Sequence, residues 1–175
     1  MDDGFYIGGG GQFNPTMLTH FGAIDVAVTT EERSDYTVIA SFALSPEGKL
    51  FVEDVFREKI ESPDIIPKAK QIASKNNWSY VCIENQGLSK PFVQEAARAG
   101  LRVKEIKAIK DKITKSLPLS ARMEAGDILF KKGASWLAEL ERELLTFPVG
   151  KNDDMVDALG LAASTLSARR EWTAY

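Results

Sequence analysis

The chain has 175 residues, 44% of them hydrophobic and 27% charged, which is the composition of one ordinary globular domain with its own core. A single cysteine, Cys82, and a single histidine, His20, exclude an internal disulfide and a zinc site built from cysteine or histidine clusters. The net charge of −3 excludes a uniformly basic nucleic-acid surface, and no apolar run is long enough to span a bilayer. We therefore expect no membrane partner, and nucleic acid can be bound only through a local basic patch.

Residues 1–19 are rich in glycine and are predicted to form a linker or arm, and the folded domain is expected to cover residues 20–175. Three apolar runs open that domain, at 21–28, 36–44 and 50–56, and polar turns separate them. These runs predict three antiparallel strands.

Two acids lie in comparable places on different predicted strands. Asp25 lies within the first apolar run, where a lone carboxylate is costly unless it is paired or bound to a cation. The alternative is that Asp25 ends its strand and faces water. Glu84 ends a later strand, in a segment where strands and helices alternate. That segment is predicted to contain a helix at 62–76, a strand at 78–84, a helix at 89–100 and a strand at 101–106.

The alternation implies parallel strands joined by right-handed crossovers. Ligands gather at the carboxyl ends of such strands, where the chain connections diverge. The antiparallel strands are expected on one side of the first strand and the crossover strands on the other. We therefore expect Asp25 and Glu84 to share the gap between them.

A lysine-rich stretch follows the last of these strands. It is the densest positive stretch of an acidic chain, although such a run is also compatible with a solvated face. We predict that its lysines contact a phosphate backbone without reading sequence. The predicted contacts are Lys107, Lys110, Lys112 and Lys115.

The chain then continues with a helix at 113–124 that is expected to be interrupted near Pro118, a short strand at 126–130 and an amphipathic helix at 134–145. Three carboxylates stand at the head of the last, apolar helix: Asp153, Asp154 and Asp157. Helix capping explains one or two acids in a first turn, and Asn152 is the candidate cap, but a third acid is not needed for it.

The chain thus has three acidic sites: Asp25, Glu84 and the Asp153/Asp154/Asp157 cluster. If they meet, bare carboxylates at about 4 Å would repel by roughly 4 kcal/mol at an effective dielectric near 20. Protons or divalent cations must neutralise such a site. Oxygen ligands without histidine or cysteine favour Mg²⁺ or Mn²⁺. Two such ions, about 3.5–4 Å apart, can activate water and stabilise the leaving oxygen of a phosphodiester. The chain contains no glycine-rich nucleotide-binding motif with Lys-Ser/Thr.

The run Phe-Pro-Val-Gly-Lys-Asn-Asp-Asp-Met-Val-Asp-Ala-Leu at 147–159 resembles the last motif of the nuclease domain of the large terminase subunit of tailed bacteriophages. The strand with Asp25, followed by Ser-Asp-Tyr at 34–36, and the run Val-Cys-Ile-Glu-Asn at 81–85 resemble that family's first two acidic motifs. The segments 110–112 and 122–126 fall where the family has a basic loop and a short strand. The resemblance covers about residues 20 to 165.

The resemblance implies an α/β, ribonuclease-H-like fold that is related to Holliday-junction resolvases. Its mixed five-stranded sheet has three antiparallel strands plus parallel crossover strands, is flanked by helices and carries a small extra strand or hairpin. It also implies a two-metal endonuclease, with Mg²⁺ or Mn²⁺, that cuts concatemeric viral DNA during genome packaging. The catalytic metal ligands implied are Asp25, Glu84, Asp153 and Asp154. Asp154 and Asp157 have the i, i+3 spacing of the final acid pair in resolvases, so the role of Asp157 stays open.

Many relatives have histidine where this chain has Asn152, which argues against proton transfer there but not against metal binding. The implied partners are double-stranded DNA and, in a full-length subunit, an N-terminal ATPase motor domain, the portal and the small terminase subunit. The chain is then an excised, monomeric C-terminal domain that acts in the host cytoplasm and is absent from the mature virion.

Two other functions compete with this one. A free-standing Holliday-junction resolvase would need a strongly basic dimer surface, which a chain with net charge −3 does not indicate. A catalytically idle module that docks DNA or the portal would be favoured if one of the three acidic sites were missing from the sequence, and none is missing.

Overall fold

A computed structural model describes residues 17–26, 36–85, 90–109 and 111–170, apart from the side chains of residues 85 and 167–170. The described strands are β1 (Thr19–Asp25), β2 (Thr37–Leu44), β3 (Leu50–Glu58), β4 (Val81–Asn85), β5 (Val103–Lys107) and β6 (Ile128–Phe130). The described helices are α1 (Ser62–Lys75), α2 (Lys90–Arg98), α3 (Lys112–Glu124), α4 (Leu137–Thr146) and α5 (Asp154–Arg170). The predicted arm lies almost wholly outside the described residues, so its boundary stays a prediction.

Within the described residues, six strands form one mixed sheet in the order β5-β4-β1-β2-β3-β6. β1, β2 and β3 pair antiparallel, while β4 and β5 continue the sheet in parallel on the far side of β1. This confirms the predicted arrangement around the first strand. The predicted extra strand, β6, joins the sheet by pairing in parallel with β3, so the sheet has one strand more than the five expected.

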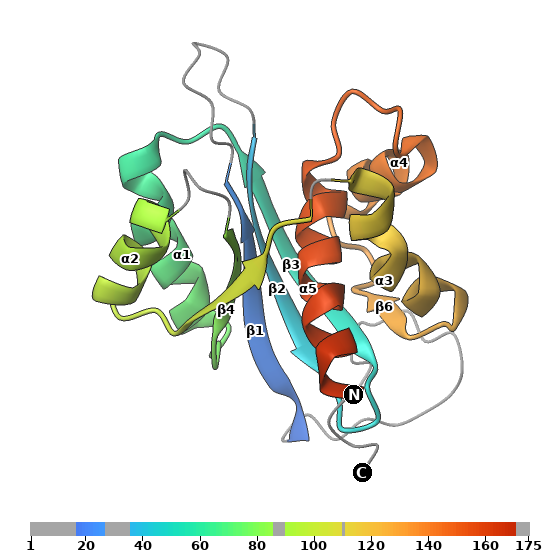
Figure 1. The fold of residues 1–175 in the computed structure, drawn as a ribbon, viewed down its shortest axis with the longest axis horizontal. Helices are drawn as coiled ribbons and strands as arrows, with labels where there is room; N and C mark the ends of the chain where they lie inside the picture. Colours follow the sequence, from blue (N-terminus) through green and yellow to red (C-terminus); the bar gives the residue numbers. More distant parts are fainter. Residues whose placement is uncertain (1–16, 27–35, 86–89, 110, 171–175) are drawn as a thin grey trace.

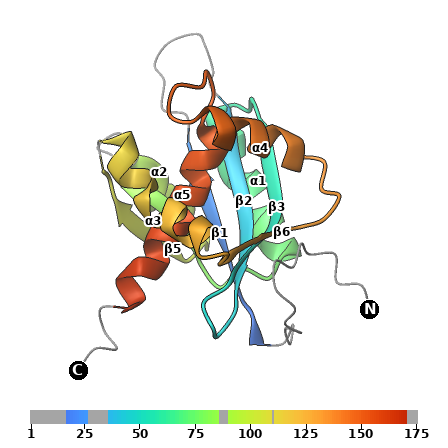
Figure 2. The same ribbon diagram turned by 90° about the vertical axis from the view of Figure 1, so that its right-hand side faces the viewer.

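Helices cover both faces of this sheet, as Figures 1 and 2 show. Side chains of a strand alternate between the two faces, so residues of β1 belong to two hydrophobic cores, one on each face. Phe21 belongs to the core that includes Met155 and Leu159 of α5. Ile24 belongs to the opposite core, which includes Ile65 of α1 and residues of α2.

Helix α3 differs from the prediction at Pro118. The helix runs without a break from Lys112 to Glu124, although proline removes one backbone hydrogen bond. Two features stabilise it. The Asp111 side chain caps its start by accepting a hydrogen bond from the Thr114 N–H at 2.7 Å, and Leu119 is buried in the α5 core.

Helix α5 lies across the centre of the sheet, in contact with β1, β2 and β4. Its first residue is Asp154, so the acidic cluster meets the sheet where β1 ends at Asp25. None of the helices in the described ranges has the length and hydropathy that a membrane-spanning segment requires.

Candidate active site

Asp25 and Glu84 lie on neighbouring parallel strands and face the same side of the sheet. Ile24 of β1 pairs with Ile83 of β4, and each acid comes one residue after that pair. Because side chains alternate, the acids point away from the two isoleucines, towards the face that α5 covers. Glu84 is buried, and Asp25 keeps some contact with solvent. The predicted convergence of these two acids is therefore present in the fold.

Helix α5 adds Asp154 and Asp157 to this group. The two residues are i, i+3 neighbours in its first turn and therefore lie on one side of the helix. Burial, and after it the charges of Asp157, Asp154 and Glu84, raise the pKa of Asp25 to about 7. Four carboxylates from three elements thus share one electrostatic environment.

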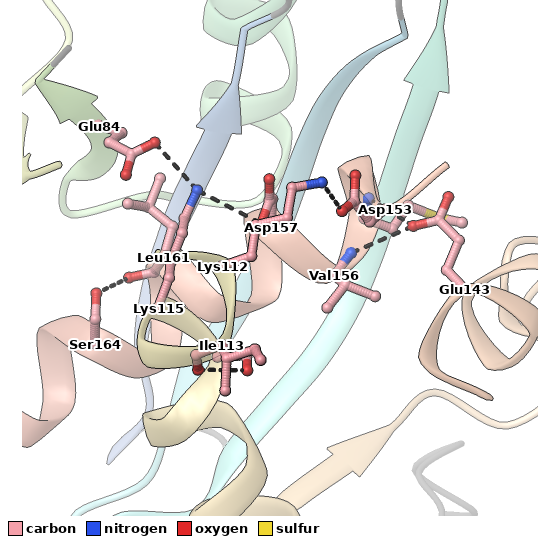
Figure 3. A network of polar contacts seen from close by, with 12 residues as sticks. Glu84, Lys112, Ile113, Lys115, Glu143, Asp153, Val156, Asp157, Leu161 and Ser164 are labelled. Carbon is pink, nitrogen blue, oxygen red and sulfur yellow. Dashed lines mark hydrogen bonds and ion pairs between the residues drawn. The ribbon is translucent and has the colours of Figure 1, made fainter. Parts of the chain in front are cut away.

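Lys115 of α3 lies among these carboxylates. Its Nζ is 3.1 Å from Glu84 Oε2 and 3.5 Å from Asp157 Oδ1, as Figure 3 shows. Although burial opposes its charge, the carboxylates of Asp157 and Glu84 raise the pKa of Lys115 above its usual range. Lys115 also lowers the pKa of Asp25. A residue predicted to contact phosphate is therefore the internal counterion of the acids.

Asp153 makes a separate ion pair. Its carboxylate accepts a hydrogen bond from Nζ of Lys112, which is itself half exposed (Figure 3). That hydrogen bond raises the pKa of Lys112. Of the other predicted phosphate contacts, Lys107 is exposed at the end of β5, and Lys110 lies outside the described residues.

Two residues that sequence reasoning did not single out hold the start of α5. Glu143 of α4, with a side chain only 3% exposed, accepts hydrogen bonds at Oε2 from the N–H groups of Met155 (2.9 Å) and Val156 (3.4 Å). Arg57 of β3 is 3.4 Å from Glu143 Oε1 and, through Nη2, 3.5 Å from Asp154 Oδ2. Asn152 is the expected cap, but these hydrogen bonds go to Glu143 instead. The Asn152 amide, in the orientation that satisfies both of its groups, donates to the Lys151 carbonyl at 3.2 Å and accepts from Arg57 Nη2 at 3.1 Å.

The donor set fits a hard divalent cation. Carboxylate oxygens are the ligands that Mg²⁺ and Mn²⁺ prefer, and burial together with the neighbouring carboxylates disfavours the charged form of Asp25, which a bound cation would favour. Among the described side chains, no three acids are already arranged as a ligand group, and Lys115, Lys112 and Arg57 make ion pairs with the acids. The residues that would hold a cation here are Asp25, Glu84, Asp154 and Asp157.

A hollow of about 540 Å³ lies elsewhere, near the amino ends of β4 and β5. Trp78, Tyr80 and Arg102 are among the residues that line it. It contains no predicted site residue, and it is at the opposite end of these strands from the carboxylates.

Comparisons with known proteins agree with this architecture. The family model of the Terminase RNaseH-like domain matches residues 22–166. No curated protein sequence matches the chain.

Several solved structures share the fold. The large terminase nuclease from thermophilic phage G20c, with bound zinc, has a TM-score of 0.66 and 19% identity over 87% of this chain and 83% of that one. The nuclease domain of the large terminase subunit gp2 of bacterial virus Sf6 has a TM-score of 0.54 and 12% identity over 79% and 74%. The fowlpox virus Holliday junction resolvase has a TM-score of 0.54 and 9% identity over 86% and 99%.

Proposed function

The chain belongs to the terminase RNaseH-like domain family, and from this membership we propose that it is the nuclease domain of a phage large terminase subunit. Such a domain is an endonuclease that hydrolyses phosphodiester bonds of concatemeric viral DNA during packaging. The observation that carries this proposal is the meeting of Asp25 and Glu84, from adjacent parallel strands, with Asp154 and Asp157 at the start of α5.

The cofactors we propose are two divalent cations, Mg²⁺ or Mn²⁺. The donor set supports hard cations, and the related G20c nuclease has been solved with bound zinc, magnesium and cobalt. When bound, a pair of such ions supplies an activated water and stabilises the leaving oxygen.

The ligands we propose are Asp25, Glu84, Asp154 and a fourth carboxylate. The resemblance implies Asp153 as the fourth residue, and its carboxylate pairs with Lys112. Asp157 shares Lys115 with Glu84 and acts directly on the pKa of Asp25. These contacts support Asp157 as the fourth ligand.

The residues of this chain prepare the site in two ways. Asp25, with a pKa of about 7, is about half protonated near neutral pH without metal and must lose that proton to bind a cation. A cation bound by Glu84 and Asp157 would neutralise the carboxylates that hold Lys115, so Lys115 becomes available for the DNA phosphates next to the cleaved bond. Lys112, which is half exposed and paired with Asp153, would contact the same phosphates from the surface. Lys107 and Lys110 would extend this contact along the backbone.

Other features rest on family membership. We propose that the domain follows an ATPase motor domain in the complete subunit, works with the portal and the small terminase subunit, and acts in the host cytoplasm. We also propose that the isolated domain is a monomer and that the protein is absent from the mature virion.

Plasmid cleavage tests the proposed activity. The purified chain should nick and linearise supercoiled plasmid in Mn²⁺ or Mg²⁺ with little sequence preference, and Asp25→Asn or Glu84→Gln should abolish cutting while the fold stays intact. Failure to cut with either metal, under conditions where the protein binds the plasmid, would contradict the proposal. A four-way junction offered beside linear duplex separates this enzyme from a resolvase, which would prefer the junction.

A further inference from the structure

Arg57 and Glu143 form a buried ion pair directly behind the proposed ligand Asp154. Their side chains are 14% and 3% exposed, and they come from β3 and α4. The closest charged atoms, Arg57 Nε and Glu143 Oε1, are 3.4 Å apart without a well-formed hydrogen bond. The guanidinium also stacks on the Tyr36 ring, 3.7 Å from its centroid. The pair is therefore fixed in place but is not optimised as a hydrogen-bonded pair.

Arg57 faces two carboxylates at once. Its Nη2 is 3.5 Å from Asp154 Oδ2, so the same guanidinium that contacts Glu143 also contacts Asp154. The strand register places Arg57 there, because Asp25 pairs with Val38 across β1 and β2, and Val38 pairs with Arg57 across β2 and β3. Arg57 thus shares one face and one row of the sheet with Asp25.

Glu143 has a separate task for each oxygen. Oε2 accepts the hydrogen bonds of the first turn of α5, and Oε1 faces Arg57. Burial raises the pKa of Glu143 above its usual range, although the Met155 N–H and the Arg57 charge act in the opposite direction. A buried glutamate with these partners is a counterion as well as a helix cap.

Taking the proposed function as given, we propose that Glu143 and Arg57 are positioning residues for metal binding at Asp154. Arg57 orients the Asp154 carboxylate, and Glu143 both holds the first turn of α5 and balances the Arg57 charge. Without that balance, the full charge of Arg57 would act on Asp154 and compete with a cation for its oxygens. Partners of this kind behind a ligand typically change metal affinity ten- to a hundredfold.

Glu143→Gln removes the negative charge of Glu143 and keeps its role as the hydrogen-bond acceptor at the start of α5. The glutamine side-chain oxygen can still accept the Met155 and Val156 hydrogen bonds, so α5 keeps its start. The negative charge is lost, and Arg57 acts on Asp154 without compensation. We expect the Kd for Mn²⁺, measured by titration calorimetry on the whole chain, to rise about tenfold. The Mn²⁺ concentration for half-maximal plasmid cleavage rises by the same factor, and saturating Mn²⁺ restores the rate.

The double variant Glu143→Gln/Arg57→Met removes both charges and keeps an apolar stem beneath Tyr36. Its Mn²⁺ Kd should fall below that of Glu143→Gln, because the uncompensated charge is gone, but stay above that of wild type, because the Arg57 contact that orients Asp154 is lost as well. A purely structural role of Glu143 predicts no such recovery. The matched control is Glu53→Gln, the same chemical change in the His20–Glu53 pair (3.0 Å) that joins β1 and β3 away from the acids. Its Mn²⁺ Kd should stay within about twofold of wild type.

The proposal is overturned if Glu143→Gln binds Mn²⁺ as tightly as wild type. It is also overturned if saturating Mn²⁺ fails to restore cleavage by a Glu143→Gln protein whose thermal unfolding is unchanged. Wild-type protein that binds no Mn²⁺ would instead contradict the proposed nuclease function. The two failures are therefore distinguishable in the same titration.

Discussion

Lys115→Met should tighten divalent-metal binding to the isolated domain about tenfold. Methionine keeps most of the length and apolar stem of lysine and removes the charge that neutralises Glu84 and Asp157. Each of these contacts, at 3.1 and 3.5 Å, is worth about 5 kcal/mol of attraction at an effective dielectric near 20. Most of this attraction is offset by the desolvation of the three groups, which leaves about 1–2 kcal/mol. That remainder corresponds to about five- to thirtyfold in an equilibrium constant.

The same remainder predicts the stability of the metal-free protein. Without Lys115 the carboxylates repel one another, so Lys115→Met should lower the free energy of unfolding in EDTA by about 1–2 kcal/mol. Adding Mn²⁺ should then increase the free energy of unfolding of the variant more than that of wild type. Titration calorimetry gives the Kd, and thermal unfolding with and without Mn²⁺ gives the stability. Lys107→Met, the same change at an exposed lysine at the end of β5, is the control and should change neither quantity. Unchanged or weaker Mn²⁺ binding by Lys115→Met would refute the view that lysine and metal compete for these oxygens.

Three further predictions follow from the same site. Because the folded-state pKa of Asp25 is raised from 3.8 to about 7, its contribution to stability is full below pH 3.8 and is lost as pH rises through 7. The stability of Asp25→Asn relative to wild type, both without metal, should therefore be about 2 kcal/mol greater at pH 8 than at pH 4, once the partial solvent contact of Asp25 is considered. Chemical denaturation of both proteins at the two pH values checks this. Asp157→Asn should weaken Mn²⁺ binding at least tenfold more than Asp153→Asn, and equal effects in calorimetry would return Asp153 to the ligand set. Lys107→Met should weaken binding to a DNA duplex and reduce the slope of log K against log salt by about 1; an unchanged slope would remove Lys107 from the DNA contact.

The positions of Asp25 and Glu84 could be predicted because strand patterns constrain them. Asp25 lies within one short apolar run and Glu84 ends another, and the strand–helix alternation makes the two strands parallel neighbours. In a parallel sheet, equivalent ends meet at one edge. This required no knowledge of distant contacts, so the sequence alone was sufficient.

The partners of these acids could not be predicted in the same way. Arg57 and Glu143 meet through the packing of β3 against α4, which no local pattern reveals. Each gave a weak signal: Glu143 is three residues after the buried Leu140, and Arg57 is two residues after Val55 in the same strand. A charged residue on an inward-facing position indicates a buried partner without identifying it.

The lysine-rich stretch shows a related limit. Charge density marked Lys112 and Lys115 as phosphate contacts, but only the packing of α3 against α5 shows that both lie on carboxylates. The same packing gives Asp153 and Asp157 different lysine partners, which spacing within a first helical turn could not predict.

The central claim is that carboxylates from β1, β4 and α5 form one metal centre. A crystal of the domain soaked in Mn²⁺, with anomalous difference density measured, tests it most directly. We expect manganese bound by Asp25, Glu84 and Asp154, with Asp157 as the fourth carboxylate and the Lys115 ammonium moved away from Glu84. Manganese bound elsewhere, or Lys115 still paired with Glu84 and Asp157 at saturating Mn²⁺, would contradict it.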